Sequence, residues 1–171
     1  MVYRRAERSW VKQQTIEAPQ LNFWGFGSCV AIEGEHLVLS SQHKESQQST
    51  LFTYHLDRTN DTWHHDGKLL PPGRASALSV HKGVLVATVN SGADEHREVC
   101  GVVYQLNKGE EGGDVWKELV TLKTNGVPKR GVEVSISVSV EGGMIYTGRV
   151  DYSPNGTGVV FVHDISKTSK H

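Results

Sequence analysis

Residues 28–39 read SCVAIEGEHLVL, which is the pattern of two short apolar strands joined by a turn that contains glycine. The pattern returns as SALSVHKGVLVA at residues 76–87 and as ISVSVEGGMIYT at residues 136–147. Three copies of one hairpin in a chain of 171 residues indicate an internal repeat, and such a repeat constrains the fold of the whole chain.

Three tryptophans extend this repeat beyond the hairpin. Trp10, Trp63 and Trp116 are 53 residues apart. Each is followed by an apolar segment, a loop with proline, the hairpin, and a further apolar strand. These last strands are expected at 51–56, 101–106 and 158–165. The sequence therefore predicts a unit of four strands in about fifty residues.

The periodicity of the third copy favours strands independently. Between Val132 and Val140, apolar residues alternate strictly with glutamate and serine. A period of two puts the apolar side chains on one face of a strand and does not form one apolar face of a helix. We therefore expect an all-β protein.

Four strands per unit are typical of a β-propeller blade, whereas the rungs of a β-helix are about half as long. We predict three four-stranded blades per chain, which is half of a six-bladed ring. The alternative fold is a sandwich of twelve strands, but a sandwich does not require its strands to recur in identical order.

Particular residues carry a family resemblance. Residues 26–34, FGSCVAIEG, with LVL at 37–39, resemble the FG-GAP-type repeat of integrin-α-like β-propellers. GVVY at 101–104 and GVVF at 158–161 resemble its next element, although the Phe-Gly pair occurs only in the first copy. Some members of that family hold calcium in loops equivalent to 42–49, 90–98 and 149–156. None of these loops alternates carboxylates, so we expect no calcium site.

The resemblance also implies which strand of each blade is innermost. The first hairpin strand would lie inside and the tryptophan strand outside, so that Trp63 closes the first blade and Trp116 the second. The third blade would end near Ile165 without such a strand, and the segment from Trp10 to Ile16 fits the missing place. Residues 1–9 are then an N-terminal arm, 10–165 the three-blade unit, and 166–171 a tail.

Three blades are too few to close a ring, since typical rings have four to eight. An open arc would leave unpaired strand edges in water. We therefore expect a homodimer in which each N-terminal strand completes the partner's third blade. The alternative is that a different chain completes the propeller.

Composition excludes several classes of partner. Eighteen Lys and Arg residues balance nineteen Asp and Glu residues, so charge gives no reason to expect nucleic acid or an anionic membrane. No apolar run is long enough to insert into a membrane, and no secretory signal is visible, so we expect a cytoplasmic location. Cys29 and Cys100 are too few for a disulfide framework and are expected to be reduced.

No catalytic, metal or cofactor pattern stands out. The chain has no Gly-x-Ser-x-Gly motif, and neighbouring histidines such as His64 and His65 point to opposite faces of a strand. Glu33, His81 and Glu141 occupy equivalent positions before the hairpin turns. They are most simply polar turn residues, although in an enzyme they would line one rim of the ring.

We therefore expect a non-catalytic interaction or scaffold module. The candidate residues are the repeated Trp10, Trp63 and Trp116, together with Phe23, Trp24 and Phe26, an aromatic cluster suited to a contact surface. The first alternative is a carbohydrate-binding, lectin-like propeller in which the repeated tryptophans stack on sugars. A weaker alternative is an enzyme with a site in the central channel.

Overall fold

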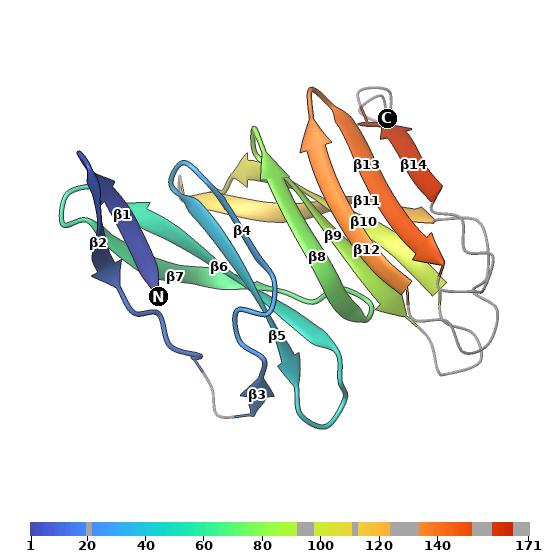
Figure 1. Cartoon of the computed structure of the whole chain (residues 1–171), viewed down its shortest axis with the longest axis horizontal. Coiled ribbons are helices and arrows are strands. Elements are labelled where there is room, and N and C mark those ends of the chain that lie inside the picture. The colour runs from blue at the N-terminus through green and yellow to red at the C-terminus, as the bar shows by residue number, and fades with distance from the viewer. Residues whose placement is uncertain (20–21, 92–97, 111–112, 124–133, 152–158, 166–171) are drawn as a thin grey trace.

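The computed structural model describes residues 1–19, 22–91, 98–110, 113–123, 134–151 and 159–165. These residues form fourteen β-strands and no α-helix, which confirms the expected all-β class. The strands make three larger antiparallel sheets and one N-terminal hairpin, arranged in a row (Figure 1). The N-terminal hairpin and the last sheet lie at opposite ends of this row (Figure 1).

Each sheet is built from strands that follow one another along the chain. Sheet 1 contains β4 (Val30–Glu33), β5 (His36–His43), β6 (Ser49–Asp57) and β7 (Thr62–Leu69), with β3 (Phe23–Trp24) paired to the far end of β5. Sheet 2 contains β8 (Arg74–His81), β9 (Val84–Ser91), β10 (Glu98–Lys108) and β11 (Asp114–Lys123). Sheet 3 contains β12 (Val134–Glu141), β13 (Met144–Asp151) and β14 (Val159–Asp164).

Trp63 and Trp116 lie in the fourth strands of sheets 1 and 2, as the phase of the repeat predicts. Among the described residues, sheet 3 has three strands and β14 pairs only with β13. The N-terminal hairpin consists of β1 (Val2–Ala6) and β2 (Ser9–Gln14). The expected N-terminal arm thus contains a strand, and Trp10 lies in β2, which is paired with that strand.

Glycine makes the turns between the first two strands of each sheet. Gly83 has φ +71° and follows Lys82 at φ +49°, the backbone of a type I′ hairpin turn. Gly142 and Gly143 repeat this geometry at +59° and +82°. A Cβ atom on Gly83 would lie 3.4 Å from the Cβ of Leu106, which is close to ordinary van der Waals contact, so glycine is favoured here by the positive φ.

Equivalent hydrogen bonds show that the three sheets are copies of one unit. The backbone N–H of Leu56, Leu106 and Ile165 each donates to the residue before the second strand of its own sheet. The acceptors are the carbonyls of Glu35, Gly83 and Gly143, at 2.9, 2.8 and 2.9 Å. This bond fixes which residues of the three sheets correspond to one another.

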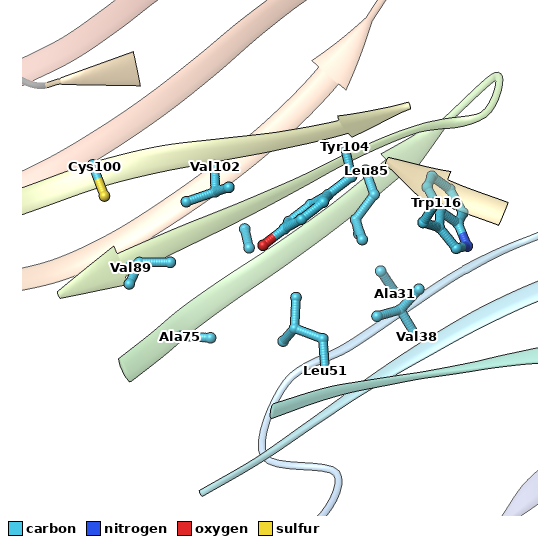
Figure 2. Packing of buried hydrophobic residues seen from close by; sticks show 11 residues of the cluster. Ala31, Val38, Leu51, Ala75, Leu85, Val89, Cys100, Val102, Tyr104 and Trp116 are labelled. Carbon is cyan, nitrogen blue, oxygen red and sulfur yellow. The ribbon is translucent and has the colours of Figure 1, made fainter. Parts of the chain in front are cut away.

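The sheets stack face to face through two apolar clusters. The first joins sheets 1 and 2 and includes Leu51, Leu85 and Val102, which are fully buried (Figure 2). The second joins sheets 2 and 3 through Val86, Val103, Val140, Ile145 and Ile165. Burial of each such side chain stabilises the fold by about 1.5–3 kcal/mol, so the two clusters favour the stacking of the sheets.

A third cluster lies on the remaining face of sheet 1. It contains Leu37, Leu39, Phe52, Tyr54 and Trp63. The N-terminal hairpin, the segment after it and the loop before β4 cover part of this cluster, through Val2, Ile16, Phe23 and Phe26.

Some sequence predictions fall outside the described residues. These are the tail 166–171, the start of the alternating stretch at Val132, and the parts of two candidate calcium loops at 92–97 and 152–158. In the part of the chain that is described, no helix is long and apolar enough to cross a membrane. Cys29 and Cys100 form no disulfide.

Candidate interaction surface

The face of sheet 3 that points away from sheet 2 is apolar and open. Tyr146, Val160 and Val162 are 40%, 65% and 52% exposed, and they lie on adjacent strands of this face. Their equivalents in sheet 2 are Val86, Gly101 and Val103, and both valines are fully buried against sheet 3. The equivalents in sheet 1 (Val38, Leu51 and Thr53) are also buried.

At the other end of the row, the outer face of sheet 1 carries the third cluster and is partly covered, but its edge strand β4 is exposed. Val30 and Ile32 of β4 are 53% and 54% exposed. Their equivalents in β8, Leu78 and Val80, pack against the cluster shared with sheet 1. The equivalent of Ile32 in β12, Val140, is buried against sheet 2. The chain therefore has exposed apolar residues at both ends of the row of sheets, on the outer face of sheet 3 and along β4 of sheet 1, and these two surfaces are called the open faces below.

The three repeated tryptophans occupy different environments. Trp63 and Trp116 are buried, at 5% and 9% exposure, whereas Trp10 is 69% exposed. Trp116 meets the ring of His36 of sheet 1 edge-on, with 6.1 Å between ring centroids. The Trp63 indole donates to Oε1 of Gln13 at 3.3 Å. Each buried tryptophan thus faces the element that precedes its own sheet.

The N-terminal hairpin docks beside β7 through side-chain amides. Gln14 accepts a hydrogen bond from the Trp63 backbone N–H at 2.7 Å and donates to the Trp63 carbonyl at 3.1 Å. Gln13 donates to the Asp61 carboxylate at 2.7 Å, and Arg4 lies 3.5 Å from the same carboxylate. Polar groups along the outer edge of sheet 1 are thereby satisfied.

The predicted aromatic cluster is divided between core and surface. Phe23 and Phe26 pack edge-on against Phe52, with ring centroids 5.3 and 5.8 Å away. Trp24 is 48% exposed, and its carbonyl accepts a hydrogen bond from the Ser41 hydroxyl. Trp24 is therefore the most exposed of these three aromatic side chains, while Phe23 and Phe26 are partly buried.

Two histidine–carboxylate pairs bridge sheets 1 and 2. His81 lies 3.2 Å from Glu33, and His36 lies 3.7 Å from Asp114. The first pair joins two of the three equivalent positions before the hairpin turns, while Glu141 is on sheet 3. His55 pairs with Asp66 within sheet 1, and its ring stacks on that of His64.

These polar groups are engaged with one another across or within sheets. In the part of the chain that is described, no group of three or more His, Cys, Asp or Glu side chains could hold a metal ion. The geometry of the described residues thus offers apolar sheet faces and a docked hairpin as its most prominent surface features.

The sequence did not single out the five apolar residues of the open faces or the two glutamines. Each apolar residue looks like an ordinary inward-facing strand residue. The five apolar residues could have been identified by comparing equivalent positions in the three copies of the repeat. The first copy has no copy before it and the last has none after it in this sequence, so one face of each lacks a neighbour.

A scan of family models finds no match to this chain, and a search of curated proteins finds none either.

Proposed function

We propose that this protein is a non-catalytic interaction module of the β-propeller type, with three blades per chain, which completes its ring by association with a second copy. Sheets 1, 2 and 3 are the three blades. The ring is a rigid scaffold that presents its loops to a protein partner.

One observation carries this proposal: the row of stacked sheets ends in two open apolar faces. The positions on the open face of sheet 3 are buried in sheets 1 and 2, and the positions of Val30 and Ile32 are partly buried in β8, where sheet 1 is the neighbour. Contiguous exposed apolar surface of this kind marks an interaction site. Two copies of three sheets give six, which lies within the range of closed propellers.

The mass of the native protein in solution tests the proposal. Size-exclusion chromatography with light scattering is expected to give twice the mass of one chain at micromolar concentration. A mass equal to one chain over the accessible range of concentrations would contradict self-association. A higher mass with a different number of copies would contradict the six-bladed ring.

Carbohydrate binding is a second candidate, favoured by the exposure of Trp10 and Trp24. Exposed indole rings can stack on the apolar faces of sugars, whereas the buried Trp63 and Trp116 are not available for this role. A change in tryptophan fluorescence on addition of members of a glycan panel, abolished by Trp24→Ala, would support this candidate. An unchanged spectrum across the panel would count against it.

A further inference from the structure

We propose that β2 of one copy adds to the edge of β14 in a second copy, with Trp10 placed opposite the second copy's Ile165. This inference rests on the proposed self-association and names the strands and residues that form the joint. The occupant of both open faces is therefore a second copy of this chain.

The first argument is the position of the segment that follows β2. Ile16 lies 53 residues before Leu69, which in turn lies 53 residues before Leu122. Leu69 packs into the cluster between sheets 1 and 2, and Leu122 into the cluster between sheets 2 and 3. Each therefore packs against the next sheet along the chain. Ile16 likewise packs against sheet 1.

The segment from β2 to Ile16 thus occupies the place of the outer strand of a sheet that would precede sheet 1. Among the described residues, this preceding sheet consists of β2 and its partner β1 alone. The described part of the chain also contains sheet 3, which has three strands where sheet 2 has four and where sheet 1 has four in addition to the two-residue strand β3. A second copy whose sheet 3 covers the open face of sheet 1 would bring β14 beside β2.

The register follows from the two complete sheets. Trp63 is paired with Leu56, and Trp116 is paired with Leu106. The equivalent of these leucines in sheet 3 is Ile165, which directly follows β14 and makes the same backbone hydrogen bond. Trp10 is the equivalent of the two tryptophans, so the joint pairs Trp10 with Ile165 of the second copy. Ile165 would there take the place of Arg5 of β1, with which Trp10 is paired in the single chain.

This register buries the side chain of Trp10 and leaves that of Val11 in solvent, as in the equivalent strands of sheets 1 and 2. Trp10 would enter the cluster that contains Val140, Ile145 and Ile165 in the second copy, as Trp116 enters the cluster between sheets 1 and 2. The adjacent Val11 would stay in solvent, because its equivalents His64 and Lys117 are exposed in complete sheets. Val11 is 47% exposed in the single chain and therefore supplies a matched control.

The first test compares Trp10→Ser with Val11→Ser. Trp10→Ser is expected to raise the dissociation constant of the dimer by about 30-fold or more, which is typical of the loss of a buried tryptophan anchor. Val11→Ser is expected to leave it unchanged. Both side chains are exposed in the single chain, so circular dichroism should show that each variant folds.

A disulfide provides a second, independent test. The Leu56 N–H points towards β5, so Leu56 and Trp63 form a non-hydrogen-bonded pair, whose Cα atoms typically lie about 4.5 Å apart. This spacing is within reach of a disulfide. The double variant Trp10→Cys, Ile165→Cys should give a covalent dimer on oxidation. Val11→Cys, Ile165→Cys and the two single variants Trp10→Cys and Ile165→Cys should not.

The outcomes separate this inference from the proposed function. A wild-type dimer that persists at unchanged affinity in Trp10→Ser, with no cross-link in the cysteine pair, would overturn the strand exchange and leave self-association standing. A monomeric wild-type protein would overturn both.

Discussion

Tyr104 places a polar hydroxyl group inside an apolar cluster. It is 3% exposed within the cluster between sheets 1 and 2 (Figure 2). Its hydroxyl is buried and has no hydrogen-bond partner among the described residues. Burial, reinforced by the charges of Glu118 and Cys100, raises the pKa of Tyr104 far above its ordinary value of 10. Its phenolate is therefore strongly disfavoured in the folded protein.

Replacement of Tyr104 by phenylalanine is expected to stabilise the protein. The ring and its packing are kept, while an unsatisfied buried hydroxyl, which costs about 1–3 kcal/mol, is removed. Urea denaturation at pH 7 should therefore show a higher free energy of unfolding. Tyr3→Phe, at an exposed position in β1, should show no change. A loss of stability in Tyr104→Phe would mean that the hydroxyl is hydrogen-bonded.

The same residue predicts a dependence on alkaline pH. The unfolded chain releases the tyrosine proton near pH 10, whereas the folded chain retains it, because the pKa of Tyr104 is raised in the folded state. Stability therefore falls as pH rises above 10, by up to about 1.4 kcal/mol per pH unit for this group. The difference in stability between Tyr104→Phe and wild type should widen over that range. A constant difference would contradict the raised pKa.

At the scale of single elements, the docking of the N-terminal hairpin depends on few contacts. Gln14 makes two of them, both to the backbone of Trp63. We expect Gln14→Ala to loosen the hairpin, because each lost hydrogen bond removes about 0.5–1.5 kcal/mol. Hydrogen exchange at the Trp63 amide should become about tenfold faster. Lys12→Ala, at an exposed site on the same strand, should leave the rate unchanged.

The elements that sequence predicts well are those with a strong local pattern. The three hairpins combine alternating apolar residues with glycine turns, and these features act over a few residues. β1 could not be predicted in this way, because its residues Val2–Ala6 read VYRRA and lack an apolar alternation. Its position depends on pairing with β2 and on the glutamine contacts to β7, which are tertiary features.

The candidate surface shows the same limit more sharply. Trp63 and Trp10 have the same place in the repeat, yet one is buried and the other exposed. The difference arises from the elements that pack beside each tryptophan, which for Trp63 include the N-terminal hairpin, and a local pattern contains no information about them. The pairing of Glu33 with His81 likewise requires the stacking of two sheets.

At the scale of the whole molecule, sheet 2 contributes to both clusters that join the sheets. Loss of sheet 2 would therefore remove the packing of sheets 1 and 3 together. We expect a single cooperative unfolding transition, with coincident midpoints from far-ultraviolet circular dichroism and tryptophan fluorescence. A separate early loss of strand signal, without a change in the environments of Trp63 and Trp116, would show that sheet 3 unfolds independently.

The two open faces differ from each other, and this difference affects how copies of the chain assemble. When two copies join through unlike faces, the assembly still has one unoccupied face of each kind, so further copies can add. The copies then form a fibre, unless the rotation between neighbouring copies brings the last copy into contact with the first and closes a ring. Closure is therefore a matter of angle, set by how strongly each sheet is turned relative to its neighbour. A substitution in the packing between sheets 1 and 2 that alters this angle would convert a closed assembly into an open polymer, even though every contact between copies remained as strong as before.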